Sequence, residues 1–322
     1  MRMFRGWVLV VALAFAIAYF SDFVLNAYLQ LILFYVAINI MLATSLNLVS
    51  GFCGQFSLGH AGFMAVGAYV AALVSFNFQP FPEGMTILNY PIYVVAGGLC
   101  AAFAGLLVGV PSLRLRGDYL AIVTLGFSEI IRVVLLNLEV VGGARGMYGI
   151  PSSTDFWACV HAFCWAGGTT LLLWRLVHSS YGRAFLSVRE DEIAAECMGI
   201  NTTATKVKAF VISSFFAGAA GAIFAQTTGS LNPASFQFVK SVDVVIMVVL
   251  GGMGSLSGSI IGAILVTILP EALRPLQEYT GVDLRLVIYS LVLVLLMILR
   301  PSGIFGSKEW MHFVRRRRAT RG

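Results

Sequence analysis

Few side chains of this sequence are ionisable, and two of them lie inside one apolar stretch. In "YLAIVTLGFSEIIRVVLLN", residues 119–137, Glu129 and Arg132 stand three positions apart. On a helix this spacing puts both charges on one side, together with Thr124 and Ser128, so that they can pair. Opposite charges within an apolar segment either hold two helices together or line a path for a polar solute. The sequence leaves both interpretations open.

His60 and Asp243 each open a segment that follows or contains a glycine-rich stretch. A lone histidine in such a place is more often a hydrogen-bonded packing residue than a proton relay. The aspartate suits a helix N-terminus, where the helix dipole stabilises anions. The sequence contains no G-x-x-x-x-G-K-[ST] phosphate loop, no H-E-x-x-H and no G-x-S-x-G. We therefore expect no enzyme activity in this chain, no cofactor and no metal site.

Two glycine-rich interruptions follow one pattern. "VSGFCGQFSLGH" (49–60) and "VLGGMGSLSGS" (249–259) both read as an apolar run, Gly-x-x-Gly, Ser-Leu, Gly and then small residues. Broken helices duplicated in two halves of a membrane protein are typical of a transport path. Close helix packing is the alternative interpretation. The candidate path residues are Gln55, Ser57, Gly59, His60, Thr124, Ser128, Glu129, Arg132, Gly251, Gly254 and Ser257.

"VREDEIAAECMGIN", residues 188–201, concentrates charge in a chain that has only 11% charged residues. Acidic residues come first, as suits a helix N-terminus, and Gly199 suits a helix end. Between them lies a narrow apolar stripe of Ile193, Ala194, Cys197 and Met198. We predict a surface helix of about two to three turns, too short to be stable alone. Its stripe needs a partner, either the membrane base of the same chain or another subunit.

The elements that position these residues are membrane helices. Apolar residues make up 59% of the 322 positions, above the roughly 45–50% of soluble domains. Runs near 18–20 apolar residues can cross the ~30 Å hydrocarbon core of a bilayer. We predict an all-α polytopic membrane protein with about 8–10 transmembrane helices and two glycine-broken segments. The apolar runs are 7–20, 31–49, 92–110, 119–136, 209–225, 244–269 and 284–299.

The positive charges predict an orientation. With both termini in the cytoplasm, 16 of the 21 Lys and Arg residues fall on the cytoplasmic side, as the positive-inside rule requires. This count needs the run 242–269 to return to the side that it left, which its glycines allow. The net charge of +6 therefore reflects topology and does not indicate nucleic-acid binding.

Four blocks of sequence carry a family resemblance. They are "LNLVSGFCGQFSLGHAGFMAVGAYVAAL" (46–73), "LRLRGDYLAIVTLGFSEIIRVV" (113–134), "GRAFLSVREDEIAAECMGINTTATKVKAFVISSFFAGAAGAIFA" (182–225) and "VVLGGMGSLSGSIIGAIL" (248–265). Together they resemble the permeases of branched-chain amino acid ABC importers, across residues 30–305. "LRLRGDYLAIVTL" and the terminal "LRPSGIFG" are more similar to the LivM-type than to the LivH-type subunit.

The resemblance implies that residues 1–306 form the permease domain of a multi-pass protein of the bacterial inner membrane. Residues 307–322 would be a basic cytoplasmic tail, and the loop at about 178–206 would couple to an ATPase. Related importers carry E-A-A-x-x-x-G in this loop, whereas here Ile193 separates the acid from the alanines. The coupling residues implied are Arg189, Asp191, Glu192, Ala194, Ala195 and Gly199.

The resemblance also implies partners and a solute. The partners are two ABC ATPase subunits, a homologous LivH-like permease, an extracytoplasmic solute-binding protein and membrane lipid. The solutes implied are leucine, isoleucine and valine, moved by alternating access. A permease for urea or short amides is the nearest alternative. An ion-driven secondary transporter or channel would need ionisable residues at the broken helices, which offer chiefly His60 and Asp243, and a structural scaffold would not explain the capped helix.

Overall fold

The computed structural model describes residues 2–79, 88–113, 118–274 and 303–306, and the pairs 290–291, 294–295 and 298–299. In these parts seven helices are long and apolar enough to cross a membrane, which confirms the predicted all-α polytopic fold. The seven are α1 (Arg2–Val24), α2 (Ala27–Asn47), α3 (His60–Asn77), α4 (Tyr90–Ser112), α5 (Asp118–Asn137), α6 (Phe156–Val177) and α9 (Thr202–Thr228). Most of the predicted crossing at 284–299 and the tail at 307–322 lie outside the described residues.

The shorter elements join or interrupt these helices. A π-helix, η1 (Leu48–Phe52), continues α2 into the first glycine break. The helices α7 (Ser180–Glu190) and α8 (Glu192–Cys197) form the loop between α6 and α9. On the opposite end, β1 (Met147–Tyr148) and β2 (Ser230–Leu231) pair antiparallel, with Met147 opposite Leu231. The 3₁₀ turns are η3 (Glu139–Val141), η4 (Gly143–Arg145) and η5 (Pro233–Phe236).

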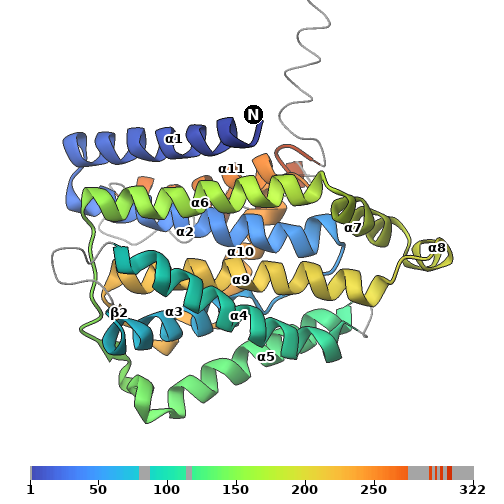
Figure 1. The fold of residues 1–322 in the computed structure, drawn as a ribbon, viewed down its shortest axis with the longest axis horizontal. Helices are drawn as coiled ribbons and strands as arrows, with labels where there is room; N and C mark the ends of the chain where they lie inside the picture. Colours follow the sequence, from blue (N-terminus) through green and yellow to red (C-terminus); the bar gives the residue numbers. More distant parts are fainter. Residues whose placement is uncertain are drawn as a thin grey trace, which may run out of the picture.

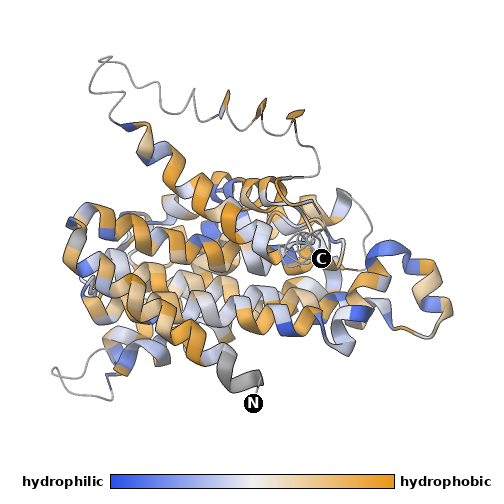
Figure 2. Cartoon of the chain, turned by 90° about the horizontal axis from the view of Figure 1, so that it is seen from above, coloured by the Kyte–Doolittle hydropathy of each residue, from blue (hydrophilic) through white to orange (hydrophobic). Residues whose placement is uncertain are grey.

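The long helices run side by side, and α7 and α8 project from one end of the bundle (Figure 1). Helix α2 is central: 83% of its candidate membrane span is buried inside the structure. Helix α1 is peripheral, with 17% of its candidate span buried. Apolar residues cover the long helices, and polar residues gather at the ends (Figure 2). This distribution matches a bundle whose sides face hydrocarbon and whose ends face water.

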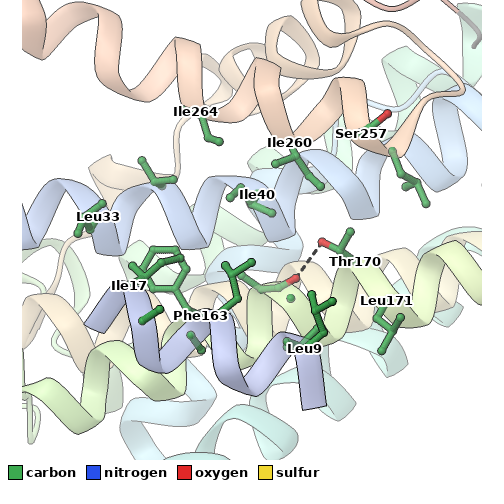
Figure 3. Close-up of a pocket in the computed structure, with 18 of the residues that line it drawn as sticks. Leu9, Ile17, Leu33, Ile40, Phe163, Thr170, Leu171, Ser257, Ile260 and Ile264 are labelled. Carbon is green, nitrogen blue, oxygen red and sulfur yellow. Dashed lines mark hydrogen bonds between the residues drawn. The ribbon is translucent and has the colours of Figure 1, made fainter. Parts of the chain in front are cut away.

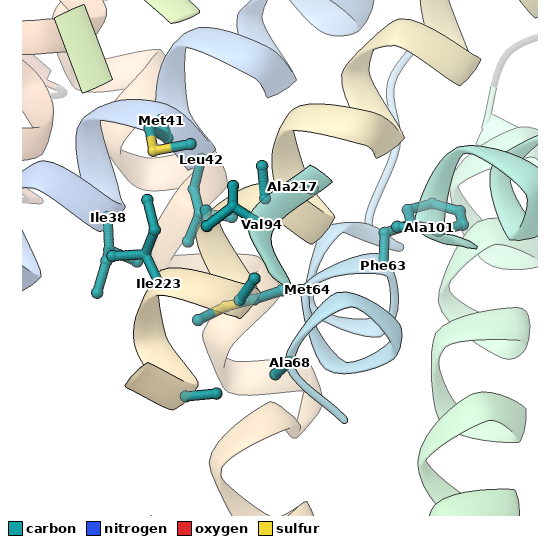
Figure 4. Close-up of a cluster of buried hydrophobic side chains, with 14 of the residues drawn as sticks. Ile38, Met41, Leu42, Phe63, Met64, Ala68, Val94, Ala101, Ala217 and Ile223 are labelled. Carbon is teal, nitrogen blue, oxygen red and sulfur yellow. The ribbon is translucent and has the colours of Figure 1, made fainter. Parts of the chain in front are cut away.

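Small residues let the central helices approach closely. A Cβ added to Gly67 on α3 would overlap the backbone of Gly218 on α9. Such glycine contacts allow dense packing between helices that gain no hydrophobic driving force from lipid. Around them, a cluster of buried apolar side chains joins α2, α3, α4 and α9 (Figure 4).

The run 242–269 folds as a helical hairpin, consistent with the predicted return. Helix α10 (Phe238–Gly251) and helix α11 (Leu256–Ala272) flank the glycine break. A Cβ on Gly251 would overlap the Gly258 carbonyl, and one on Gly262 would overlap the Met247 carbonyl. Residues further from the break on α10 therefore lie against residues further from the break on α11, so the two helices are antiparallel. The break therefore lies at the turn of the hairpin.

Candidate functional site

The segment 188–201 forms a capped surface helix, as its sequence predicts. Asp191 is the N-cap of α8 and accepts hydrogen bonds from the backbone N–H groups of Ile193 and Ala194 at 2.9 and 3.0 Å. Gly199 has φ +82°, the left-handed conformation that ends many helices, and Asn201 caps α9. Helix α8 has only 6 residues, fewer than the expected two to three turns.

Two side-chain contacts fasten α8 to the start of α9. The ammonium of Lys206 lies 2.6 Å from a carboxylate oxygen of Glu192. The Lys206 side chain is only 2% exposed, and an unpaired cation there would be costly. Thr202 donates a further hydrogen bond of 2.6 Å to Glu196. The expected coupling residue Glu192 therefore holds the loop to its own membrane domain.

The outward surface of α8 differs from the predicted small-residue surface. Ala195 is 4% exposed and packs into a cluster of the chain's own side chains, including Leu48, Phe185 and Val188. The large apolar side chains exposed on this helix and at its end are Ile193, 64% exposed, and Met198, 82% exposed. Ala195 is thus buried against its own chain, contrary to the expected small-residue surface, whereas Ala194 and Gly199 are exposed.

The two glycine breaks meet at what we call the break junction: Asn47, Gly51, Gly254, Ser255 and Ser259. The Asn47 side chain donates to the Ser255 carbonyl at 2.9 Å and to the Ser259 hydroxyl at 2.7 Å. Its amide oxygen accepts from the Gly254 N–H at 2.9 Å. A Cβ on Gly51 would overlap both Asn47 and Gly254, so glycine is required for this approach.

The loop between α6 and α9 reaches the break junction through Arg189 of α7. A guanidinium nitrogen donates to the Gly51 carbonyl at 2.8 Å, and another lies 3.1 Å from the Glu190 carboxylate. The Arg189 Cγ would lie 2.8 Å from a Cβ added to Gly54. The loop between α6 and α9 is therefore joined to the first break by a side chain.

A segment near the C-terminus covers the second break. The backbone N–H groups of Ile304 and Phe305 donate to the carbonyls of Leu250 and Gly251 at 2.9 and 3.3 Å. These are carbonyls of the last turn of α10, which have no partner inside the helix. Gly303 lies against Gly252, and a Cβ there would approach the Gly252 Cα to 2.6 Å. Residues 303–306 thus complete the end of α10.

The residues around the start of α3 are hydrogen-bonded packing residues in this conformation. His60 is buried, with Nε2 2.9 Å from the Ser45 hydroxyl. The Thr124 hydroxyl accepts from the Leu58 N–H at 3.0 Å, and Gly59 lies against the Thr124 carbonyl. The predicted path residues of the first break and of α5 are therefore brought together.

Three other predicted path residues have only weak side-chain hydrogen bonds, or none, within the described part of the chain. Ser57 is buried, and among the described residues it accepts only a long hydrogen bond, 3.4 Å, from the Gly59 N–H. Gln55 is half-buried, with its amide nitrogen 3.5 Å from the Cys53 carbonyl. The Ser128 hydroxyl is buried and has no hydrogen-bond partner among the described residues.

Glu129 and Arg132 form the expected ion pair on α5. The Arg132 Nε lies 2.7 Å from the Glu129 carboxylate, and the side chains are 23% and 32% exposed respectively. Both charges come from one helix, so the pair does not join α5 to a neighbour. It lies on a helix whose candidate membrane span is only 28% buried inside the structure. The pair is therefore on an outer side of this chain.

The large cavity in Figure 3 lies between α1, α2, α6 and α11 and has a volume of about 960 Å³. Its lining is apolar apart from Thr170, Ser257 and the Trp174 indole, and Thr170 donates to the Ala166 carbonyl. An apolar wall cannot replace the water around a charged amino or carboxylate group. The cavity therefore does not suit an amino acid, although the predicted path residue Ser257 lines it.

Sequence reasoning missed two polar contacts that join the halves of the chain. Asn47 was not singled out, although a polar residue inside an apolar run is a signal for a buried contact. Lys240 donates to the Asn39 side chain at 3.1 Å, and Asn39 donates to the Thr267 hydroxyl at 2.8 Å. This second contact joins α10, α2 and α11 away from the break junction.

Comparison with known proteins places this arrangement in a family. The family model described as "Branched-chain amino acid transport system / permease component" matches residues 28–299. The chain belongs to this family. It is a permease component, which confirms the family resemblance and the interpretation as a multi-pass protein of the bacterial inner membrane.

Relatives in this permease family resemble most of the chain. The "high-affinity branched-chain amino acid transport system permease protein LivM" of Salmonella typhimurium is 38% identical over 299 residues, covering 83% of this chain and 67% of the relative. The protein of the same name from Escherichia coli gives the same values. LivH of Salmonella typhimurium is 24% identical over 285 residues, covering 84% and 91%. No solved structure matches the chain.

Proposed function

We propose that this chain is the LivM-like permease subunit of an ATP-driven importer for leucine, isoleucine and valine. Its relatives LivM and LivH carry "branched-chain amino acid transport" in their names, and LivM shares 38% identity. Two ABC ATPase subunits, a LivH-like permease and an extracytoplasmic solute-binding protein complete the assembly. Both termini lie in the cytoplasm, on the same side as α7 and α8.

The observation that carries this proposal is the surface of α8. The helix is capped by Asp191, fastened by the Lys206–Glu192 ion pair, and presents Ile193 and Met198 outward. Apolar side chains on a rigid, exposed turn are typical of a contact with another subunit. Because the sequence has no phosphate loop, the energy of ATP has to reach this chain through such a contact.

The outer side of α5 supports a permease partner. The Glu129–Arg132 pair is partly exposed on this side, and charges are unfavourable against hydrocarbon. A second permease subunit packed on α5 would cover the pair and place it beside a path between the two subunits. Ser128 and Thr124, on the inner side of α5, lie next to the first break.

Uptake measurements test the solute. We expect the complete importer, expressed in a strain that lacks its own system, to take up radiolabelled leucine. Unlabelled isoleucine and valine should compete, and urea, acetamide and glucose should not. Competition by urea or acetamide without competition by valine would contradict the proposed solute class and favour the amide alternative.

Replacing the outward side chains tests the ATPase contact. Ile193→Asp with Met198→Asp should leave membrane insertion normal, release the ATPase subunits on detergent extraction and abolish uptake. Tyr148→Asp is the control, since Tyr148 is also exposed but lies in β1 at the other end of the bundle. Retained ATPase and normal uptake in the double variant would refute the proposed contact.

A further inference from the structure

We propose that Arg189 is a positioning residue that links the coupling loop to the break junction, so that displacement of α7 moves the first glycine break. The proposal rests on the proposed function for the origin of that displacement, an ATPase bound at α8. Its structural part, that Arg189 holds the break in place, stands on contacts within this chain alone.

The first step is the contact itself. Arg189 lies in the last turn of α7, two residues before Asp191, the cap residue of helix α8. Its guanidinium donates to the Gly51 carbonyl at 2.8 Å across 138 positions of sequence. Gly51 lies in the π-helical turn that ends α2, where carbonyls lack helical partners. A charged donor makes this a strong type of hydrogen bond.

The second step is that the same side chain touches both breaks. A Cβ on Gly54 would meet the Arg189 Cγ at 2.8 Å, and a Cβ on Gly254 would meet a guanidinium nitrogen at 2.9 Å. Both glycines have positive φ, +70° and +85°. The backbone at each break is thus shaped so that the arginine fits between the breaks.

The third step is that the loop is packed against the first break and against α9. Val188 and Ala195 pack in the same cluster as Phe52 and Cys53 of the first break, and Lys206 pairs with Glu192. A push on Ile193 or Met198 is therefore carried to Arg189 through a short, tightly packed loop. Coupling between sites requires a contact that differs between two states, and Arg189 supplies such a contact at the break.

Cys53 provides a native reporter for the experiment. It lies in the first break, is 0% exposed, and has a buried counterpart, Cys159, on α6. In a background with serine at Cys100, Cys164 and Cys197, thiol labelling followed by mass spectrometry reads both cysteines separately. Cys159 reports general unfolding, and Cys53 reports local opening of the break.

We expect Arg189→Ala to raise the labelling rate of Cys53 about tenfold or more, the effect of losing one charged hydrogen bond. Cys159 should stay unlabelled. Arg183→Ala is the matched control, because Arg183 is an exposed arginine of α7 whose side chain bonds to Ser180 of the same helix. Arg189→Lys, which keeps a cation but loses the forked donor, should give a smaller rise. Unchanged Cys53 labelling in both Arg189 variants would overturn the proposal.

The complete importer tests transmission. A non-hydrolysable ATP analogue should change Cys53 labelling in the wild type and in Arg183→Ala, but not in Arg189→Ala. The Arg189→Ala importer should hydrolyse ATP while its uptake falls about tenfold or more. A nucleotide response retained without Arg189 would overturn the proposed link. The labelling measurements need no solute, so failure of the wild type to import leucine would count against the proposed function alone.

Discussion

The two glycine breaks have similar sequences but are held in different ways. At the second break, Asn47 binds Gly254 and Ser255, Ser255 caps α11, and residues 304 and 305 bind the end of α10. At the first break, the Gly51 carbonyl is bound by Arg189 of the coupling loop, and α3 begins without a side-chain cap. The second break is thus held by hydrogen bonds from α2 and from residues 304 and 305, whereas the first break also receives a charged hydrogen bond from the loop between α6 and α9. The proposed link through Arg189 therefore acts on the first break.

The largest effect is expected where the two breaks touch. Gly51→Ala places a Cβ against the Asn47 amide and the backbone of Gly254, neither of which can move freely. Overpacking against backbone should lower the free energy of unfolding by about 3 kcal/mol or more. Thermal unfolding in detergent would measure this. Gly126→Ala is the control, because a Cβ there meets nothing within 4 Å. Equal melting temperatures for the two variants would contradict the close contact.

Removing the side chain that fixes the second break should have the next largest effect. Asn47→Ala leaves the buried Gly254 N–H and Ser255 carbonyl without this partner, at a cost of about 2–3 kcal/mol. Asn137→Ala should cost little, since Asn137 is exposed and its side chain donates only to Val133 of its own helix in the described structure. The same unfolding measurement compares them. A milder effect at Asn47 than at Asn137 would mean that the second break is held by other contacts.

Removing a capping hydroxyl should destabilise the protein more at the second break than at the first, with both effects smaller than those above. Ser255→Ala removes the hydroxyl that accepts from the Gly258 N–H at 3.2 Å, and should cost about 1 kcal/mol. Ser57→Ala removes only the 3.4 Å contact with the Gly59 N–H and should cost less than about 0.5 kcal/mol. If the two variants lose equal stability, the caps do not distinguish the breaks.

Reactivity of introduced cysteines should give the smallest difference. Ser257→Cys lies half-exposed on the large apolar cavity, whereas Ser57→Cys is buried in the first break. A membrane-permeant maleimide should therefore label position 257 faster in the resting protein. Binding of the ATPase partner with nucleotide should change labelling at 57 more than at 257. The opposite order of nucleotide response would make the second break the movable one.

The sequence predicted the features that depend on local residue chemistry. Gly199 and Asn201 marked the limits of α8 and α9 because left-handed backbone and side-chain caps have strong residue preferences. The spacing of Glu129 and Arg132 predicted their pair because one helix carries both. The doubled glycine pattern indicated two breaks that belong together.

The features that sequence could not supply depend on contacts between distant segments. A six-residue helix has too few turns for periodicity to define its buried side, so Ala195 was expected outside and lies inside. Asn47 and Lys206 find their partners 207 and 14 positions away, and nothing in local spacing identifies those partners. Tertiary packing decides these contacts, and residue patterns only show that some contact is needed.

The cover over the second break has a consequence for how the protein is made. Residues 303–306 leave the ribosome after all the helices from α1 to α11, yet their N–H groups complete the end of α10. During synthesis the turn of the α10–α11 hairpin therefore lacks these two backbone hydrogen bonds until Ile304 and Phe305 have been translated. A chain terminated before Gly303 would keep this defect permanently. Residues translated after α11 thus complete the turn between α10 and α11.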